Sequence, residues 1–451
     1  MTAPSALPPG PPPRGRGLST RLRYGYAFIT DPIGFVGGRF GRYGDVYYAP
    51  STTEPLYVFR HPDHLRVILS VRADSFEKDH TAFRQLRGVL GNGLLTTDGD
   101  TWLKHRRLLN PQFVRRATDG YVDSMAAEAE RTAEDAPLGR PVDAAELMID
   151  LTLRIVGRTL LGTELGDSTD RVSDSMRTFQ RTLAAPSMVP GPLGSLLRWR
   201  ADAATAELHA IIDRVIRARR SGSRGDDLLQ RLLDAVDPED ERVRLSEADI
   251  RDHLVTFLLA GHETTSNTLT WTLGLLARDP VAQAAVRDEI RSVVGAKRVT
   301  ADDVRALPLT ESAINEAMRL YPPVYLIARR AKQAVEVGGY TLPAGAEAVL
   351  WIYFTHRDPR FFPKPDAFVF DRFANGSTDG LHKHAYVPFG AGPRACIGRA
   401  FATNEAIAIL ATLLARVRVH AAGRPIAAVS PRITLSPKGG MPLVFERVGG
   451  S

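Results

Sequence analysis

Cys396 is the only cysteine in the 451 residues of this chain, and the residues around it suit a metal-binding thiolate. A lone cysteine cannot form a disulfide within the chain, and a zinc cage made only of cysteines would need partners that the chain lacks. Gly392 allows a tight turn with positive φ, and Gly398 lets the backbone approach a flat ligand because glycine has no Cβ. Arg394 can donate hydrogen bonds to a carboxylate on such a ligand. These residue types predict a loop that presents one thiolate to one metal ion.

The chain after this loop favours the ionised form of the thiol. Residues 399–417 have the pattern of an amphipathic helix, which places Cys396 near a helix N-terminus. The partial positive charge at a helix N-terminus stabilises a thiolate. A buried structural cysteine is the simpler alternative, and for a single cysteine taken alone it is the more common case.

The spacing of the loop decides between these alternatives. Its pattern is Phe-x-x-Gly-x-Arg-x-Cys-x-Gly, formed by Phe389, Gly392, Arg394, Cys396 and Gly398. This pattern resembles the cysteine loop of the cytochrome P-450 family of haem-thiolate monooxygenases. The resemblance implies that Cys396 binds the iron of haem b, iron protoporphyrin IX. It also implies that Phe389, Arg394 and Gly398 contact the cofactor, with Arg394 facing a propionate.

A second candidate site lies within a long predicted helix, at residues 260–265, which read Ala-Gly-His-Glu-Thr-Thr. Gly261 removes a side chain where a ligand could pass, and the Thr264 hydroxyl can bond back to the carbonyl of residue 260. Out of context, Glu-Thr-Thr in a helix is usually a solvated face. The segment resembles the oxygen-activation motif of the same family, which implies that Glu263 and Thr264 guide protons. His262 fits a plain helix residue better than a ligand.

Glu316 and Arg319 lie three residues apart on one predicted helix, and therefore on one face. Alone, such a pair is an ordinary surface ion pair worth under about 1 kcal/mol. With Tyr321-Pro322-Pro323 after it, the pair resembles the Glu-x-x-Arg motif of the family, whose third member would be Arg372. The family usually has proline and glutamate where this chain has Phe370-Asp371, a departure that concerns the local turn more than the arginine. We expect these three residues to be structural.

Three further residues resemble the groups that hold the haem propionates in this family. Trp102 and Arg106 lie four apart on a predicted helix, where an amphipathic helix with a buried tryptophan would otherwise explain them. Arg329 follows the Glu-x-x-Arg helix as the family's propionate-binding arginine does, and Arg330 is the alternative. The resemblance spans about Trp102 to Gly398, with the motifs in the family's order.

The composition is that of an ordinary globular protein, with 44% hydrophobic and 24% charged residues. The net charge is +7, but the basic residues are dispersed, so nucleic-acid binding is not indicated. No apolar run reaches the roughly 18 residues that would predict a membrane span. Residues 1–17 are rich in proline and glycine and lack the apolar region of a secretory signal, so we expect a disordered segment there. No linker divides residues 18–451, so we expect a single domain. Because the chain shows no secretory signal and cannot form a disulfide, we expect a cytoplasmic location.

The elements that position these residues are predicted to be mostly helical. Periodicities of 3.6 residues predict helices over residues 143–161, 197–220 and 246–278. Short strands are expected at residues 46–48, 56–59, 335–340 and 347–353, and a last hairpin across residues 433–445 with its turn at 437–440. The expected fold is therefore mainly α with a small β region, the cytochrome P-450 fold.

Together the motifs predict a haem-thiolate monooxygenase that inserts one oxygen atom from O2 into an apolar organic substrate. The reaction would be hydroxylation or epoxidation of a fatty acid, a terpene or another natural product. A peroxide-driven relative normally lacks the acid–alcohol pair formed here by Glu263 and Thr264. A haem sensor or carrier, the other alternative, would need neither a proton relay nor a substrate cavity.

The partners of this reaction are also expectations of the resemblance. The chain ends soon after the last predicted hairpin, so we expect electrons from a separate acidic ferredoxin or flavodoxin-type donor with its NAD(P)H reductase. The basic residues expected at the docking face are Lys104, Arg107, Arg115, Arg116 and Arg399, and a generic solvated surface is the alternative. The apolar residues expected to contact substrate are Leu94, Leu95, Phe257, Ala260, Val324, Ile327 and Leu435. A plain core position would explain one or two of these equally well.

Overall fold

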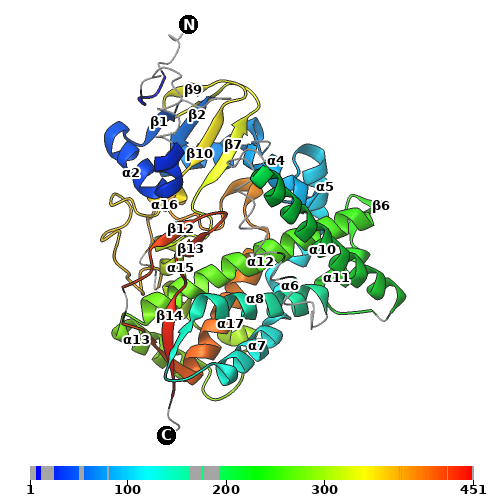
Figure 1. Ribbon diagram of the computed structural model, residues 1–451, viewed down its shortest axis with the longest axis vertical. Coiled ribbons are helices and arrows are strands. Elements are labelled where there is room, and N and C mark those ends of the chain that lie inside the picture. Colours follow the sequence, from blue (N-terminus) through cyan, green and yellow to red (C-terminus); the bar gives the residue numbers. More distant parts are fainter. Residues whose placement is uncertain are drawn as a thin grey trace. The chain divides into compact units, whose positions relative to one another are not determined.

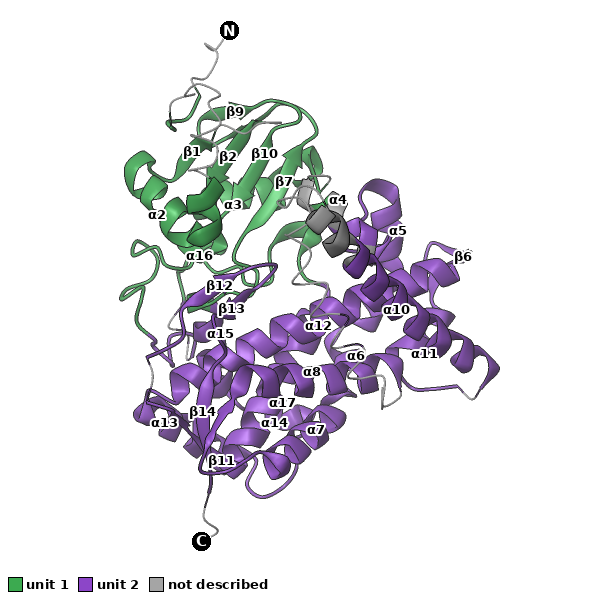
Figure 2. Cartoon of the chain, in the orientation of Figure 1, with its two compact units in different colours: residues 1–83, 319–367, 379–396 green, residues 84–318, 368–378, 397–451 purple. Residues whose placement is uncertain are grey.

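The computed structural model describes residues 7–11, 25–49, 55–78, 81–162, 172, 175, 192–222, 224–374, 376, 378–423 and 425–448. Contacts divide the chain into two compact units, each built from several stretches of sequence (Figure 2). Unit 1 comprises Met1–Phe83, Arg319–Ala367 and Asp379–Cys396. Unit 2 comprises Arg84–Met318, Phe368–Thr378 and Ile397–Ser451. That residues 18–451 form a single domain stays a prediction from the sequence.

Unit 1 is built around a five-stranded sheet with the strand order β1-β2-β10-β7-β3 (Figure 1). Strands β2 and β10 are parallel, and the other neighbours are antiparallel. The elements of unit 1 are α2 (Pro32–Tyr43), β1 (Val46–Ala49), β2 (Leu56–Phe59), α3 (Pro62–Arg66), the π-helical turn η1 (Val67–Val71), η2 (Ala73–Ser75), β3 (Phe76–Glu77), β7 (Ile327–Ala331), β8 (Val335–Val337), β9 (Tyr340–Leu342), β10 (Glu347–Leu350), α16 (Ile352–Thr355) and η4 (Gly392–Arg394).

The core of unit 1 forms where this sheet packs on α3 and η1. Strand β2 supplies Tyr57 and Phe59 to this core, and aromatic residues such as these favour strands. Leu65 from α3 and Ile68 from η1 are completely buried against them. This packing fixes η1, and the later cysteine loop lies on η1.

Unit 2 is mainly helical and contains the longest helices of the described chain. Its elements are α4 (Thr81–Leu90), α5 (Gly99–Leu109), η3 (Asn110–Gln112), α6 (Arg115–Asp119), α7 (Val122–Asp135), β4 (Pro141–Asp143), α8 (Ala144–Leu161), α10 (Pro192–Ser221), α11 (Leu228–Asp234), β5 (Val236–Asp237), β6 (Asp240–Arg244), α12 (Glu247–Leu276), α13 (Pro280–Val293), α14 (Ala301–Arg305), α15 (Pro308–Leu320), α17 (Arg399–Arg416), β11 (Val417–Ala421), β12 (Val429–Pro431), β13 (Leu435–Pro437) and β14 (Pro442–Arg447). The fold is therefore mainly α with a small β region, as the sequence predicted.

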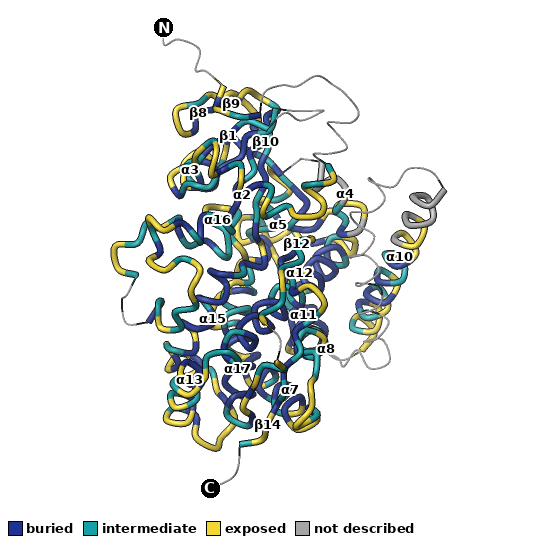
Figure 3. Tube along the Cα trace, turned by 60° about the vertical axis from the view of Figure 1, so that its left-hand side comes forward, coloured by how far each residue is buried: buried dark blue, intermediate teal, exposed yellow. Residues whose placement is uncertain are grey.

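Helix α12 runs through the middle of unit 2, with α8 and α17 packed against it (Figure 1). It begins at a capping box, in which the Ser246 hydroxyl accepts the Asp249 N–H and the Asp249 carboxylate accepts the Ser246 N–H. It ends before the sequence Asp279-Pro280, which starts the next helix. Most of its residues are buried, as the dark blue of its trace in Figure 3 shows. A helix that is buried on nearly every side belongs to the core.

Three local predictions were wrong. Residues 7–11, expected to be disordered, pack on β1, where the Tyr48 N–H donates to the Pro9 carbonyl at 3.0 Å. The single strand expected over residues 335–340 is the hairpin of β8 and β9. The hairpin expected across residues 433–445 does not form, because β13 pairs with β12 while β14 pairs with β11 and β4.

Within unit 2, α15 is tied to the segment that follows residue 368 by a buried carboxylate. Glu316 is fully buried and accepts hydrogen bonds from the Arg372 Nε at 3.0 and 3.1 Å and from the Val369 N–H at 3.0 Å. In unit 1, the buried Arg319 donates to three backbone carbonyls, those of His356, Pro365 and Ala367, at 2.6–3.0 Å. The Glu316 carboxylate and the Arg319 guanidinium are therefore both bound by groups from loops.

We predict that Glu316→Ala lowers the free energy of unfolding by about 3–5 kcal/mol, because the change leaves the Arg372 side chain, which is only 11% exposed, without its carboxylate. Urea or thermal unfolding measures the effect. The matched control is Glu311→Ala, on the exposed side of the same helix, for which we expect a change within about 0.5 kcal/mol. Equal stabilities of the two variants would contradict the structural role.

Candidate active site

The cysteine loop in unit 1 is held by its own backbone. Gly390 and Gly392 both have a φ of 69°, in the left-handed region that favours glycine. The Cys396 N–H donates to the Phe389 carbonyl at 2.8 Å, and the Ala395 N–H donates to the Gly392 carbonyl at 3.0 Å. A Cβ added to Gly392 would stand 1.8 Å from the Leu69 carbonyl oxygen of η1. Glycine at position 392 is therefore required both by the turn and by the close approach to η1.

The side chain of Cys396 is exposed at the end of this loop. That placement contradicts the alternative of a buried structural cysteine. Two residues later, Gly398 is the N-cap of α17, and its carbonyl accepts the Ala402 N–H at 2.9 Å. In sequence, the thiol thus lies next to the positive end of an 18-residue helix.

An exposed thiol in a rigid glycine loop fits a residue that would bind haem iron. Across the described ranges, no group of three or more His, Cys, Asp or Glu side chains is arranged to hold a metal ion. Cys396 therefore belongs to no such group among the described residues, which is compatible with a macrocycle that supplies the remaining ligands.

The arginines expected at the propionates lie in both units. In unit 2, Trp102 and Arg106 are half-buried on α5, four residues apart and so on one face of the helix. In unit 1, Arg329 on β7 is buried, and its Nη1 donates to the Ala328 carbonyl at 2.9 Å, whereas Arg330 is half-buried. A buried guanidinium needs negative or carbonyl partners, which favours Arg329 over Arg330 as the carboxylate-binding residue. Arg394 is half-buried in η4.

In unit 2, the otherwise buried helix α12 becomes accessible at the motif. Ala260 is exposed, and Glu263 and Thr264 are half-buried. The Thr264 hydroxyl donates to the Ala260 carbonyl at 2.7 Å, one turn back. An alcohol and a carboxylate thus stand together at an open point in the middle of a core helix.

Two neighbours in the motif are structural. A Cβ on Gly261 would meet the Val156 side chain of α8 at 3.3 Å, so this glycine lets two helices pack closely rather than leaving room for a ligand. The His262 ring is buried, its Nδ1 lies 2.6 Å from the Leu258 carbonyl oxygen, and burial lowers its pKa. The Thr152 hydroxyl of α8 donates to the His262 carbonyl at 3.1 Å.

Glu263 is positioned by a residue that the sequence did not reveal. The Thr434 hydroxyl donates to the Glu263 Oε1 at 2.6 Å, and the Asn267 Nδ2 donates to the Thr434 hydroxyl at 3.0 Å. The Trp271 Nε1 donates to the Leu435 carbonyl at 3.1 Å, which fixes β13 against α12. Thr434 lies 171 positions after Glu263, so no local sequence pattern could predict this hydrogen bond.

The residues expected to contact substrate differ in their exposure. Ala260 in unit 2 and Val324 in unit 1 are exposed, and Leu95 and Ile327 are half-buried. The backbone N–H of Leu94, a residue that is 7% exposed, donates to the His253 Nδ1 at 3.2 Å. Phe257 is equally buried and packs edge-on against Phe113. Leu435 is completely buried, so its side chain serves the core and we leave it out of the proposed pocket.

The basic surface in unit 2 is weaker than the sequence suggests. Arg107 binds Asp237 at 2.8 Å and Glu239 at 2.5 Å, so its charge is already compensated. Arg115, Arg116 and Arg399 are exposed. We therefore drop Arg107 from the expected docking residues.

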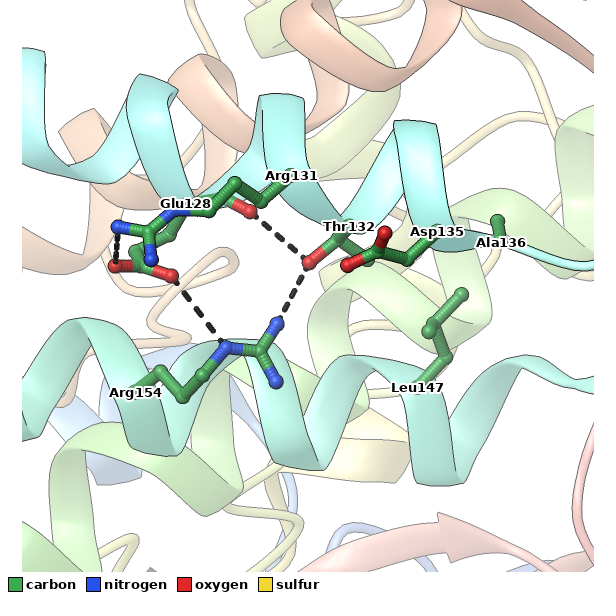
Figure 4. A pocket seen from close by; sticks show the side chains of 7 residues that line it. All are labelled: Glu128, Arg131, Thr132, Asp135, Ala136, Leu147 and Arg154. Carbon is green, nitrogen blue, oxygen red and sulfur yellow. Dashed lines mark hydrogen bonds and ion pairs between the residues drawn. The ribbon is translucent and has the colours of Figure 1, made fainter. Parts of the chain in front are cut away.

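A cavity of about 330 Å³ between α7 and α8 does not qualify as the active site (Figure 4). Glu128 at its wall is bound by Arg131 at 2.7 Å and by Arg154 at 3.4 Å. Arg154 also donates to the Thr132 hydroxyl at 2.7 Å. Glu128, Thr132 and Arg154 thus bind one another, and they form a polar cluster that joins α7 to α8.

Comparisons with known proteins agree on one family. The sequence model of the family described as Cytochrome P450 matches residues 36–443. Cyclooctatin synthase of Streptomyces melanosporofaciens is 34% identical, over 84% of this chain and 83% of its own length. Pentalenene oxygenase of Streptomyces avermitilis is 31% identical, over 88% of each chain. Cyclooctat-9-en-7-ol 5-monooxygenase of S. melanosporofaciens is 32% identical, over 84% of this chain and 83% of its own length.

A solved structure extends the likeness to three dimensions. The crystal structure of the haem domain of cytochrome P450DA superposes with a TM-score of 0.88 at 29% identity, and the match covers 99% of both chains. Among the described residues, no helix is both long enough and apolar enough to cross a membrane.

Proposed function

Since the chain belongs to the cytochrome P450 family and is a monooxygenase of that family, we propose that it inserts one oxygen atom of O2 into an apolar cyclic terpene. The single observation that carries this proposal is the exposed thiol of Cys396 at the end of a loop that only glycines can form. The reaction takes a C–H bond, O2, two electrons and two protons to an alcohol and one water. For an alkene, the product is an epoxide and one water.

We propose haem b as the cofactor, with Cys396 as the residue that would bind its iron. The haem, when bound, supplies the activation of O2, which a thiolate ligand promotes by donating electron density. Phe389 and Gly398 would shape the loop around it. The carboxylate-binding residues would be Trp102, Arg106, Arg329 and Arg394.

The chain's own contribution to the chemistry is proton handling on α12. Glu263, held by the Thr434 hydroxyl, can pass a proton to the neighbouring Thr264, whose hydroxyl lies at the accessible point of the helix. A relay of this kind delivers protons one at a time while the buried remainder of α12 excludes bulk water.

A terpene substrate is supported by the names of the relatives and by the chemistry of the accessible residues. Pentalenene oxygenase and cyclooctat-9-en-7-ol 5-monooxygenase are named for unsaturated hydrocarbon frameworks. Ala260 in unit 2 is apolar and exposed, and so, separately, is Val324 in unit 1, which suits an apolar ligand without a charged anchor. Burial of about 300 Å² of apolar surface is worth about 7.5 kcal/mol, close to micromolar binding.

We further propose that electrons come from a ferredoxin or flavodoxin-type donor with its NAD(P)H reductase, which docks at exposed basic residues such as Arg115, Arg116 and Arg399. Exposed charges are screened beyond about 8 Å at roughly 0.15 M salt, so this docking would weaken as salt rises. A cytoplasmic location stays a prediction from the sequence.

We predict that the holoenzyme, supplied with a reductase system and ¹⁸O2, forms a product from a cyclic terpene that carries one ¹⁸O atom. Mass spectrometry of the product measures this. A haem sensor or carrier would give no product, and a peroxide-driven enzyme would require added hydrogen peroxide. Strong binding of small polar ligands, with no terpene oxidised, would contradict the proposal.

We predict that Thr264→Ala lowers the amount of product formed per NAD(P)H consumed about tenfold, because misdirected protons release hydrogen peroxide instead. Thr434→Val, which removes the hydrogen bond to Glu263, is expected to lower the same ratio by a smaller factor. The matched control is Thr310→Val, a buried threonine on α15. If Thr264→Ala and Thr434→Val both leave the product formed per NAD(P)H consumed unchanged, neither hydroxyl takes part in the reaction.

A further inference from the structure

A short loop of unit 2, residues 91–97, lies directly on the first half of α12. Gly91 has a φ of 57°, and a Cβ added to it would stand 2.1 Å from the Asp252 Oδ2. A Cβ on Gly93 would stand 2.4 Å from the Thr256 hydroxyl oxygen and 3.0 Å from the Asp252 carbonyl oxygen. Contacts this close leave no room for a Cβ at either glycine, so the backbone of the loop itself packs on α12.

Two side chains of α12 bind the backbone of this loop. The Asn92 N–H donates to the Asp252 Oδ2 at 2.8 Å, and the Leu94 N–H donates to the His253 Nδ1 at 3.2 Å. Asp252 and His253 are both buried, and the Arg251 Nη2 donates to the other Asp252 oxygen at 3.2 Å. Buried acceptors hold a loop firmly, because breaking either bond would leave a buried polar group without a partner.

The surroundings of His253 keep it an acceptor. Because its Nδ1 accepts the Leu94 N–H, the neutral ring carries its own proton on Nε2. The His105 ring of α5 stands edge-on to it with ring centres 4.7 Å apart, and the Phe257 ring stacks on it at 6.0 Å. Burial, together with the nearby His105, lowers the pKa of His253 to about 3, so the ring stays neutral near pH 7.

The loop also closes on itself, so the two bonds to α12 restrain all of it. The Thr96 hydroxyl donates to the Gly91 carbonyl at 2.6 Å, and the Thr96 N–H donates to the Gly93 carbonyl at 3.1 Å. Leu94 and Leu95 are the two apolar residues between these bonds, the first buried and the second half-buried. Their position relative to α12 is therefore fixed.

The loop binds the face of α12 that carries the accessible point. With 3.6 residues per turn, positions i, i+4, i+7 and i+11 of a helix lie on one face. Counted from His253, these positions are Phe257, Ala260 and Thr264. At about 1.5 Å per residue, His253 and the exposed Ala260 lie about 10 Å apart along the helix axis. One medium-sized ligand can span that distance, so the loop borders the accessible point.

We propose that Asp252 and His253 decide which carbon of the substrate is oxidised, because they fix the 91–97 loop on α12. Leu94 and Leu95 of this loop form one apolar wall of the substrate site. The inference rests on the proposed function, whose substrate is an apolar cyclic terpene. Such a ring system has no polar group by which the protein could orient it, so the position of the apolar walls selects the carbon that reacts. Asp252 and His253 are positioning residues, since they act on the substrate only through the loop.

Hydrogen exchange of the holoenzyme, followed by mass spectrometry, tests the loop contacts without any substrate. Asp252→Leu and His253→Leu each remove one acceptor. We expect the amides of residues 92–95 to exchange about fivefold faster in these variants, the effect of one hydrogen bond worth about 1 kcal/mol. Asp252→Asn and His253→Asn keep an oxygen near the position of the lost acceptor, so both should exchange nearly as slowly as the wild type. Equal exchange in the wild type and both leucine variants would overturn the contacts.

The close approach at Gly93 gives a second, independent variant. The φ of Gly93 is not positive, so Gly93→Ala acts through the contact with Thr256 rather than through backbone strain. We expect Gly93→Ala to speed exchange of the loop and added Thr256→Ala to restore part of the protection, because neighbouring changes are not additive. Gly88→Ala, at an exposed glycine of α4 with open space around it, is the matched control and should exchange as the wild type does.

The ratio of regioisomeric products measures the effect on specificity. For a cyclic terpene that the wild type oxidises, His253→Leu should change this ratio about fivefold, in proportion to the loss of one hydrogen bond. His253→Asn should return most of the ratio, and Gly88→Ala should leave it unchanged. A merely structural role would lower the yield of active holoenzyme without moving the ratio. An unmoved ratio in His253→Leu would therefore overturn the inference.

The outcomes separate this inference from the proposed function. If the wild type oxidises no terpene, the proposed function fails and the specificity role fails with it. If the wild type turns over and the leucine variants exchange faster but give the wild-type product ratio, only the specificity role is wrong. If His253→Leu does not fold, the exchange and product ratio of Gly93→Ala, with and without Thr256→Ala, decide the matter.

Discussion

The close approach of Gly392 to the Leu69 carbonyl is the contact on which the cysteine loop depends. It allows no Cβ, and it requires a positive φ, so the chain can pass η1 only at a glycine. Two backbone hydrogen bonds then close the loop and leave the thiol of Cys396 outward. The buried packing of η1 in the core of unit 1 gives the loop a rigid base. A metal ligand gains from such rigidity, because its geometry is set before the metal binds.

In unit 2, helix α12 is the rigid element that holds Glu263 and Thr264, as η1 holds the cysteine loop in unit 1. Its burial against α8 and α17 fixes its position, and the accessible point at Ala260 and Thr264 is an exception that packing leaves open. Around this point two polar groups have separate partners, because Glu263 accepts from Thr434 and Thr264 bonds to its own helix. Polar groups inside a core are tolerated only when they have partners, and in the proposed relay those partners would restrict which way protons can move.

Much of this could be predicted from local patterns. The 3.6-residue period and the capping box located α12, and a single spaced motif located Cys396. The failures came from contacts between distant parts of the chain. The strands near the C-terminus pair with β12, β11 and β4 rather than with each other, and Thr434 meets Glu263 across 171 positions of sequence. Residues 399–417 were predicted to form an amphipathic helix, and only tertiary packing shows that residues 404–414 are all buried.

The central claim is that the thiolate of Cys396 binds haem iron, and the most direct measurement is the absorption spectrum of the reduced protein with carbon monoxide bound. A thiolate opposite carbon monoxide moves the Soret band strongly to the red. We expect the wild type to show that band and Cys396→Ser to lose it, whether or not the variant keeps haem. A red-shifted band retained by Cys396→Ser, or one absent from a haem-loaded wild type, would contradict the account.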